Sequence, residues 1–358
     1  MIYDILVIGG GIAGCVSAYF LKKEGFLVAL VEKDEICSKA SLAAGAFLSP
    51  KIALPSPYRD YVNEALKFSL DFYEKNFPSS FKKCPLFKMP YDESDEDRLK
   101  RYEKYLNIEY QKDNKGYIFK DAGLVDPKEI CEKLTENIDI LKFEVKEIER
   151  TKNFFKIGKI FAKKIVVATG SEKIFDIPYI KTKEILGYRY DAEFDGMDKL
   201  DKNFHKKASI SAFFRGKSVI GATHIRKKSC LDLLKAAKTD KFSLLKKANE
   251  IIDLQNLKIL KIYTGSRLCT FDYFPILGEI VDFKETLKKY PSIVKGAKIP
   301  PSSFAIYDNI YIHTALASRG FVLAPYNAKM LSDFLKYGKS IDFNLSTHKR
   351  FIKFVRKN

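Results

Sequence analysis

The stretch YDILVIGGGIAGCVSAYFLKKEGFLVALVE, residues 3–32, decides the fold class of this chain. Three glycines, Gly9, Gly11 and Gly14, follow a short apolar run in G-x-G-x-x-G spacing. An amphipathic segment comes next, at residues 12–23, and a second apolar run follows at residues 27–31. A strand, a glycine turn, a helix and a second strand in this order predict the βαβ unit that binds a dinucleotide.

Each part of this unit has a physical role in the predicted site. One glycine makes the tight turn, one lets the backbone approach the diphosphate, and one permits close packing of helix on strand. The predicted helix opens with Ile12 and Ala13, and its N-terminus offers unpaired N–H groups and a positive dipole to phosphates. Glu32, followed by Lys33, can accept hydrogen bonds from a ribose diol, and its charge disfavours a 2′-phosphate.

A second segment near the other end of the chain, HTALASRGFVLAP at residues 313–325, has the form of a strand-to-helix turn. We expect its central residues to meet the far end of the same cofactor: Ser318, Arg319, Gly320 and Phe321. A third piece, IVVATG at residues 165–170, is a strand that ends in a turn made of Ala168, Thr169 and Gly170. Together the three segments predict one dinucleotide site, for FAD, assembled from both ends of the sequence.

The element pattern predicts an α/β chain in which a split, Rossmann-like nucleotide-binding domain carries an inserted, mostly antiparallel β-sheet domain. The first domain is assigned to residues 1–78, 126–170 and 264–358, and the inserted one to residues 79–125 and 171–263. Helices are expected at 58–76, 126–136 and 325–336, and strands at 141–148, 160–168, 208–214, 218–222 and 310–315. Residues 79–125 are expected to be irregular, with a few short strands.

The formal net charge of +18 over 358 residues attracts polyanions, of which nucleic acid is the obvious candidate. The alternative is that lysine is common throughout the chain and merely supplies surface cations. Four runs are dense in cations, at residues 199–207, 226–228, 235–247 and 348–357. Charge alone does not choose between these two interpretations.

Other features of the sequence bound its class. No apolar run approaches the ~20 residues that span a bilayer, and no signal peptide precedes the first strand, so we expect a cytoplasmic protein with no membrane partner. No C-x-x-C pair and no metal-ligand spacing occur, so neither a metal nor a disulfide framework is expected. The six cysteines are Cys15, Cys37, Cys84, Cys131, Cys230 and Cys269.

The layout resembles the D-amino-acid-oxidase superfamily of FAD enzymes, which includes glycine oxidase and sarcosine oxidase. Within it, four segments are similar to the oxidoreductase domain of MnmC, a bifunctional protein that modifies the tRNA wobble uridine. These segments are AAGAFLSPKI (43–52), VIGATHIR (219–226), GSRLCTFDYFPILGEI (265–280) and ALASRGFVLAP (315–325). The third fits a G-x-R-x-x-T-x-D-x-x-P-x-x-G pattern, and the fourth an S-R-G turn whose backbone faces the flavin in such enzymes.

The resemblance implies a reaction and its partners. The family converts 5-carboxymethylaminomethyl-uridine, with or without 2-thiolation, to 5-aminomethyl-uridine and glyoxylate, with the tRNA anticodon stem-loop as partner. The oxidase domain is commonly fused to a methyltransferase that acts on the product. Nothing of that size flanks these residues, so we expect a stand-alone oxidase domain, with a separate methyltransferase as a further partner.

Several residues are assigned roles on this basis. Arg267 is predicted to grip the carboxylate of the substrate arm, because a guanidinium forks onto a carboxylate with two parallel bonds. The alternative is that Arg267 pairs with Asp272 or another acid; Thr270, Asp272 and Pro275 are expected to shape the turn, with Asp272 orienting Arg267. Arg319 is predicted to place positive charge near the flavin carbonyls, or else to face the surface or the substrate. The remaining candidates are Gly45 and Ala46 along the flavin, Val145 as a strand residue beside adenine, and His224 and Arg226 at the cavity mouth.

Three functions remain open at this level. The first is an FAD-dependent oxidase of the tRNA wobble uridine, with FAD bound non-covalently. The second is an oxidase or dehydrogenase of a free small amino acid such as glycine, sarcosine or a D-amino acid. The third is an FAD protein that binds RNA without oxidising it.

Overall fold

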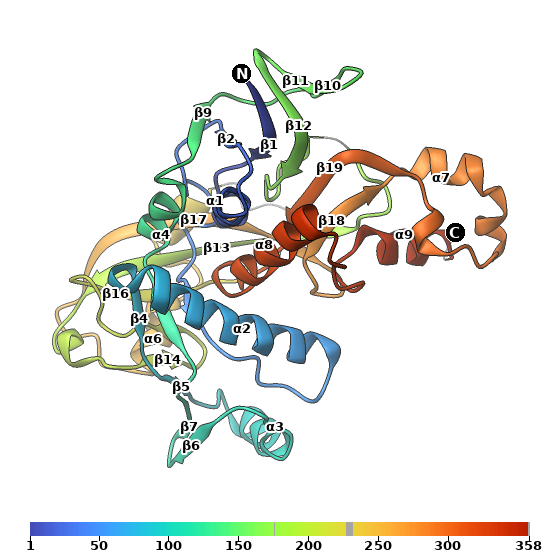
Figure 1. Cartoon of the computed structure of the whole chain (residues 1–358). Coiled ribbons are helices and arrows are strands. Elements are labelled where there is room, and N and C mark those ends of the chain that lie inside the picture. The colour runs from blue at the N-terminus through green and yellow to red at the C-terminus, as the bar shows by residue number, and fades with distance from the viewer. Residues whose placement is uncertain (175, 227–231, 357–358) are drawn as a thin grey trace.

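The first and last strands of the chain meet in one mixed sheet, here called the first sheet (Figure 1). The computed structural model describes residues 1–174, 176–226 and 232–356. Five strands of the first sheet run parallel, in the order β9, β2, β1, β12 and β19. Their bounds are Asp139–Lys142, Val28–Glu32, Ile2–Ile8, Ile160–Val167 and Ile306–Thr314. Antiparallel strands flank them: β10 (Glu149–Arg150) and β11 (Phe155–Ile157) beside β12, and β18 (Ile276–Val281) beside β19.

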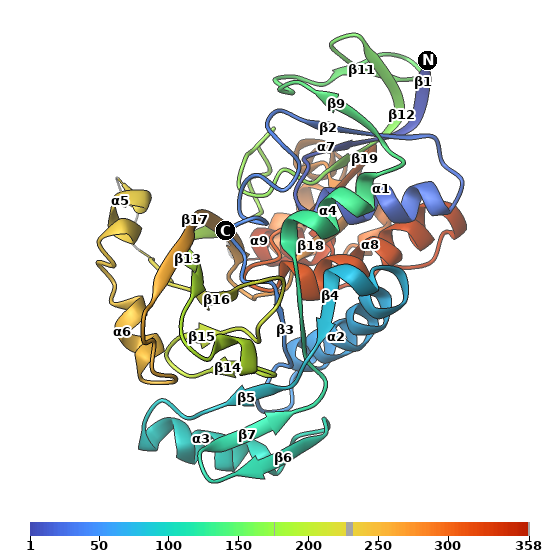
Figure 2. The ribbon, with the colours of Figure 1, turned by 90° about the vertical axis from the view of Figure 1, so that its left-hand side faces the viewer.

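Four helices form the core with one face of the first sheet (Figure 2). They are α1 (Ile12–Lys23), α2 (Pro57–Asn76), α4 (Pro127–Thr135) and α8 (Gly320–Tyr337). Local sequence sets where two of them begin. The side chain of Ser56 caps α2 by accepting a hydrogen bond from the backbone of Arg59 at 3.2 Å, and Asp126 caps α4 in the same way. Each cap precedes a proline, whose fixed φ suits the first helical position.

A second sheet carries most of the inserted residues and is largely antiparallel (Figure 2). Its order is β17, β13, β16, β15, β14, β5, β7 and β6, with β14 and β5 as a parallel pair. The bounds are Lys258–Thr270, Thr182–Glu193, Ser218–Gly221, Ser209–Ile210, Asn203–His205, Leu86–Lys88, Gly116–Phe119 and Tyr110–Asp113. Helices α5 (Leu233–Lys238) and α6 (Leu244–Asn249) pack near β13 and β17, and α3 (Glu93–Glu103) packs near β5 and β7.

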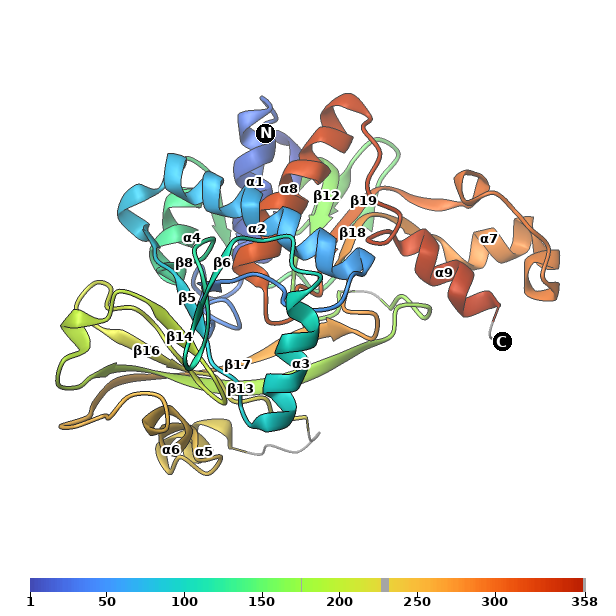
Figure 3. The same ribbon diagram turned by 90° about the horizontal axis from the view of Figure 1, so that it is seen from below.

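Smaller elements join and extend these layers. A small third sheet contains β3 (Phe47–Leu48), β8 (Gly123–Val125) and β4 (Phe81–Lys83). Along the chain, β3 and β4 come between β2 of the first sheet and β5 of the second, and β8 comes between β7 of the second sheet and β9 of the first. Helices α7 (Phe283–Lys289) and α9 (Thr347–Val355) share a separate apolar cluster, at the opposite end of the molecule from α5 and α6 (Figures 1 and 3). No helix among the described residues is long and apolar enough to cross a bilayer.

The architecture confirms the predicted α/β class with its antiparallel insertion, but several predicted elements differ. The strand expected at 141–148 is β9, which ends at Lys142. The apolar residues that follow β9, Phe143, Val145 and Ile148, pack against the first sheet without pairing with a strand of it. Their alternation with polar residues therefore resembled that of a strand. The strand expected at 208–214 is only Ser209–Ile210.

The region 79–125 also holds a helix, α3, that the sequence did not reveal. Only Asp95 and Leu99 of its eleven residues are buried, so the helix shows almost no apolar periodicity. Its stability comes instead from its cap, where Asp92 accepts from the backbone of Asp95 at 2.9 Å, and from the buried Lys88–Asp95 ion pair at 3.3 Å.

Helix α8 begins at Gly320, five residues before the predicted start at Pro325. A proline inside a helix leaves the carbonyl four residues earlier without its usual donor. Here that carbonyl belongs to Phe321, and the hydroxyl of Tyr73 on α2 donates to it at 3.1 Å. The neighbouring packing of α2 therefore lets the helix continue through the proline.

The predicted domain boundary between residues 263 and 264 falls inside strand β17. This strand pairs with β13 along its whole length, so Arg267 belongs to the second sheet rather than to the first. Of the predicted basic run 226–228, only Arg226 lies within the described residues; Lys227, Lys228 and Cys230 lie outside them. The other five cysteines are buried free thiols.

Candidate active site

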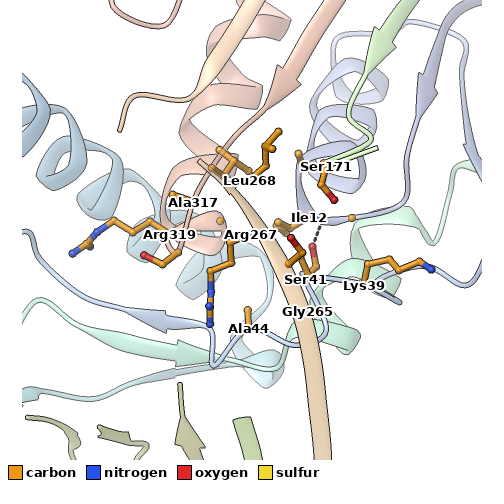
Figure 4. Close-up of a pocket in the computed structure, with 18 of the residues that line it drawn as sticks. Ile12, Lys39, Ser41, Ala44, Ser171, Gly265, Arg267, Leu268, Ala317 and Arg319 are labelled. Atoms are coloured by element: carbon orange, nitrogen blue, oxygen red, sulfur yellow. Dashed lines mark hydrogen bonds between the residues drawn. The ribbon is translucent and has the colours of Figure 1, made fainter. Parts of the chain in front are cut away.

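A cavity of about 1170 Å³ lies where the carboxyl ends of β1, β2, β12 and β19 face strand β17 (Figure 4). Open α/β sheets bind ligands at this edge, and the volume exceeds the 300–1,000 Å³ or so of ordinary small-molecule pockets. Every site residue predicted from the sequence lines it except Gly14. We call the part lined by the G-x-G-x-x-G turn and β2 the glycine end. The part lined by Lys51, residues 205–207, His224, Arg226 and Arg267 is the cationic end.

The glycine turn is packed so closely that a Cβ atom fits at neither Gly9 nor Gly14. Gly9 has φ +109°, and a Cβ atom there would lie 2.5 Å from the carbonyl oxygen of Ala168. A Cβ atom on Gly14 would lie 1.8 Å from the carbonyl oxygen of Gly9, which is why Gly14 packs behind the turn and does not line the cavity. The turn therefore presents bare backbone and the N-terminus of α1 to the cavity, a geometry that suits a diphosphate.

Acid and hydroxyl side chains hold the glycine end in place. The carboxylate of Glu32 accepts hydrogen bonds from the backbone of Gly10 at 2.6 Å and of Asp34 at 2.9 Å. The hydroxyl of Ser41 accepts from the backbone of Ile12 at 2.9 Å (Figure 4). Lys33 pairs with Glu144 at 3.3 Å and Glu172 at 2.8 Å. An ionised carboxylate has further lone pairs, so Glu32 can still accept from a ribose diol.

The turn between β19 and α8 closes the middle of the cavity. Gly320 packs closely against Ile12: a Cβ atom on Gly320 would lie only 3.3 Å from the Cγ2 atom of Ile12. The two ends of the sequence therefore meet in one wall of the cavity. Behind that wall His313, on β19, is fully buried and shares a 2.9 Å hydrogen bond with Ser17.

Arg319 uses its guanidinium to brace the loop after β3. It donates to the carbonyl of Ser49 at 2.7 Å and to that of Pro50 at 3.5 Å, and it extends away from Arg267 in Figure 4. Burial lowers the pKa of Arg319. The structure thus places this charge on protein carbonyls, and the predicted role beside the cofactor stays a prediction.

Arg267 reaches the cavity from strand β17, and its guanidinium makes one hydrogen bond to the described residues, from Nη1 to the carbonyl of Thr223 at 3.2 Å. No acidic side chain among the described residues pairs with it. Burial lowers the pKa of Arg267. Gly187 on β13 makes room for this side chain, because a Cβ atom on Gly187 would lie 2.6 Å from Nη1. Arg267 is therefore a cation whose remaining N–H groups face the cavity.

The expected link between Asp272 and Arg267 is wrong. Asp272 contacts Arg350 instead, at 3.4 Å, because the turn after β17 bends the acid away from the cavity toward α9. Thr270 does shape this turn as expected, donating to the carbonyl of Phe274 at 2.7 Å. Because Asp272 contacts Arg350, it is not the acidic partner of Arg267 that the alternative interpretation proposed.

The cationic end gathers positive groups from four remote segments of the chain. Its described ionisable residues are Lys51, His205, Lys206, Lys207, His224, Arg226 and Arg267, whereas the acids that line the cavity, Glu32, Glu144 and Glu172, belong to the glycine end. Lys206 and Lys207 share Glu250 at 3.8 and 3.4 Å. Burial lowers the pKa of His205 to about 4 and, with help from Arg267, also lowers that of His224. This end is suited to an anion.

Lys51 was not singled out in the sequence although it lies in the quoted segment 43–52. Its backbone is fixed on α2 by Asn63, which accepts from its N–H at 2.7 Å and donates to its carbonyl at 3.4 Å. Its side chain lines the cavity, and its pKa is lowered by burial and by the nearby charges of Arg319 and Arg98. His205 was hidden in a basic run, and Ser41 and Gly187 carried no local signal at all.

Val145 lies at the glycine end, but beyond the end of β9 rather than within a strand. Its predicted position in a strand is therefore wrong, while its predicted role beside adenine stays a prediction. Gly45 and Ala46 line the cavity next to β3, and Ala168, Thr169 and Gly170 line it after β12.

The fold and the cavity define the class of protein, and comparison with known families agrees. The chain belongs to the DAO family of FAD dependent oxidoreductases, whose model matches residues 4–334. FAD is the cofactor of this class, and the bare glycine turn, the acid at the end of β2 and the long cavity fit it. The chain is an FAD-dependent oxidoreductase.

Particular relatives narrow the comparison. The chain is 27% identical to the tRNA 5-methylaminomethyl-2-thiouridine biosynthesis bifunctional protein MnmC of Campylobacter fetus, over 92% of this chain and 56% of that protein. The MnmC protein of Campylobacter concisus is also 27% identical, over 98% of this chain and 60% of its own length. The chain thus spans a little more than half the length of these relatives. Among solved structures, glycine oxidase from Geobacillus kaustophilus shares the fold, with a TM-score of 0.75, 17% identity, and coverage of 96% of this chain and 98% of that one.

Proposed function

We propose that this protein oxidises the carboxymethylaminomethyl arm of a wobble uridine in tRNA and leaves a 5-aminomethyl group, with glyoxylate as the second product. The observation that carries the proposal is Arg267, a cavity-lining guanidinium with no acidic partner among the described side chains. Arg267 is partly buried, and a partly desolvated cation without an acidic partner favours an anion, which here would arrive with the substrate. The similarity to MnmC proteins supports the identity of that substrate.

The glycine end would hold the cofactor. The backbone from Gly9 to Ala13 would receive its diphosphate and Glu32 its ribose diol, with Val145 and residues 168–170 beside the adenosine. Gly45, Ala46 and residues 318–321 would line the ring system. Bound FAD supplies the acceptor for the two electrons removed from the substrate.

The cationic end would hold and orient the substrate. Arg267 would fork onto the carboxylate of the arm, which fixes the neighbouring CH₂ group. That carbon loses a hydrogen with its electron pair, and a C=N double bond forms to the arm nitrogen. Water adds to this bond, the C–N bond breaks, the nitrogen stays on the uridine as an amine, and the two carbons leave as glyoxylate. His224, Arg226, Lys206 and Lys207, which line this end of the cavity, would contact phosphates of the RNA.

A nucleoside assay tests the proposal. The yellow protein is incubated with native tRNA that bears the carboxymethylaminomethyl arm. The tRNA is then digested, and its nucleosides are separated by chromatography and identified by mass spectrometry. We expect the carboxymethyl group to disappear while glyoxylate accumulates. Anaerobic bleaching of the flavin by glycine, sarcosine or a D-amino acid, without any change in native tRNA, would instead establish the free-amino-acid oxidase. If none of these compounds reduces the flavin, the result favours the third function, an FAD protein that binds RNA without oxidising it.

A further inference from the structure

The turn between β17 and β18, residues 271–275, holds two aromatic rings in solvent, and we call it the aromatic turn. Phe271 is 63% exposed and Tyr273 is 53% exposed. Lys183 on β13 lies beside both, with its Nζ atom 5.2 Å from the centroid of the first ring and 5.5 Å from that of the second. Scattered exposed aromatics are common, but two neighbouring rings with one shared cation form a defined surface.

The aromatic turn is held in place by hydrogen bonds from the neighbouring strand and from α9. Arg350 on α9, which is only 8% exposed, donates to the carbonyls of Phe274 and Pro275 at 2.9 Å each, and Thr270 donates to Phe274 at 2.7 Å. Tyr273 adopts φ +66°, a backbone conformation that is unfavourable for a bulky residue. The fold thus uses a buried arginine and a strained residue to keep both rings in water. A strained residue persists only where its surroundings determine it, and such residues cluster at functional sites.

The aromatic turn is attached to the active-site wall. Arg267, which lines the cavity, and Phe271 are four residues apart, or about 13 Å of extended chain. The carbonyl of Leu268 accepts from Ala317 at 3.1 Å, so this end of β17 is tied to the turn before α8. Tyr273 packs on Tyr58 of α2 with a ring separation of 5.9 Å. The rings are therefore held close to the wall of the cavity, within reach of an RNA whose nucleoside is bound at Arg267.

The charge around the aromatic turn favours a nucleic acid over an apolar protein segment. Lys183 is one cation, and Lys349 is a second, with its Nζ atom 5.1 Å from the ring of Phe274. Of the nearby acids, Asp272 is paired with Arg350, which offsets its charge, and Glu184 accepts a hydrogen bond from the hydroxyl of Ser266 at 2.5 Å. Aromatic faces stack on unpaired bases, and adjacent lysines attract the backbone phosphates.

We propose that the aromatic turn stacks unpaired bases of an RNA loop that flank the nucleoside held in the active-site cavity. The inference rests on the proposed function and adds to it a surface that recognises single-stranded rather than paired RNA. Phe271 and Tyr273 supply the stacking faces, and Lys183 supplies the charge between them. The turn itself takes no part in the oxidation.

The test uses the full-length, FAD-loaded protein and the variants Phe271→Ala and Tyr273→Ala. The probes are a fluorescently labelled RNA anticodon stem-loop and a labelled RNA duplex of equal length without a loop, at one fixed salt concentration. Each variant should weaken stem-loop binding about tenfold and leave duplex binding unchanged, because only the stem-loop offers unpaired bases. Tyr273→Phe should bind like the wild type. Tyr337→Ala removes a ring that is 59% exposed on α8 and serves as the matched control.

Three outcomes would overturn the inference. Unchanged stem-loop binding in both alanine variants shows that the rings do not stack on RNA. An equal loss of binding for duplex and stem-loop shows that the rings contribute to RNA affinity without recognising unpaired bases. Self-association of the wild type that disappears in the alanine variants shows that the turn is an interface between copies of the chain. The flavin absorbance spectrum of each variant verifies that the fold and the cofactor are retained.

Binding and oxidation are separate readouts, so the two proposals can fail independently. The labelled stem-loop needs no modified base, and its binding is measured without turnover. If the variants lose stem-loop binding while native tRNA is never oxidised, the proposed function fails and the RNA surface stands. If native tRNA is oxidised and the variants bind it normally, only the inference about the aromatic turn fails.

Discussion

The two ends of the active-site cavity differ in which part of the chain faces the ligand. At the glycine end the backbone does so, because Gly9 and Gly14 leave no room for side chains and Glu32 accepts hydrogen bonds from neighbouring N–H groups. At the cationic end long side chains do so, and they come from β17, the loop after β3, the end of β14 with the residues that follow it, and the residues after β16. The first end is centred on one continuous segment, residues 8–33, with residues 143–145 and 168–172 beside it, whereas the second end has no such central segment.

The two ends should therefore differ in the substitutions that they tolerate. A backbone site depends on space, so any added atom disrupts it. A side-chain site depends on charge and reach, so a change there should alter substrate binding while the cofactor stays bound. The following changes test that division, beginning with the largest expected effect.

Replacing Gly14 by alanine should abolish FAD binding. The new Cβ atom would lie 1.8 Å from the carbonyl oxygen of Gly9, so the glycine turn must move away from α1. We expect a colourless protein after desalting and a lower unfolding temperature, measured by absorbance and calorimetry. Gly158→Ala is the control: its φ is +60° with open space around it, so it should cost about 1–2 kcal/mol and keep the flavin. A yellow Gly14→Ala protein would contradict the steric argument.

Replacing Arg267 by alanine should lower kcat/KM by about 30-fold to several thousand-fold while FAD stays bound, since loss of one partner of a desolvated charge pair costs about 2–5 kcal/mol. Arg267→Lys should recover only part of the activity, because lysine keeps the charge but cannot form two parallel bonds to a carboxylate. Steady-state kinetics with the modified tRNA measure both. The control is Arg150→Ala, which removes an exposed arginine paired with Asp308. Normal turnover by Arg267→Ala would remove this residue from the carboxylate site.

Replacing Lys51 by methionine should raise KM for the RNA substrate about tenfold, because hydrogen bonds to charged groups contribute about 1.5–3 kcal/mol. The change keeps the length of the side chain and removes its charge from the cationic end. Lys39→Met is the matched change at the glycine end, where Lys39 pairs with Asp34 at 2.8 Å, and it should leave this KM unchanged. Equal effects of the two variants would show that the ends are not functionally distinct.

The same division explains how much of the molecule could be predicted from the sequence. The glycine turn, Ile12–Lys23 and the S-R-G turn were identified correctly because their signals lie in adjacent residues. The start of α8 and the helix α3 were missed because a hydroxyl from α2 and a buried ion pair from β5 stabilise them, and neither is adjacent in sequence. The pairing of Asp272 was wrong for the same reason, since Arg350 is far along the chain.

By itself, the sequence determined the cofactor class, because a G-x-G-x-x-G turn between strand and helix dictates a backbone geometry that only glycine permits. It also indicated Arg267 as a substrate-binding residue, from its position in the G-x-R-x-x-T-x-D-x-x-P-x-x-G pattern. Only the tertiary structure decided that this arginine has no acidic partner among the described residues, and that Lys51 and His205 share its cavity. Backbone conformation is set by neighbours along the chain, whereas the partners of a long charged side chain are set by whichever segments fold against it.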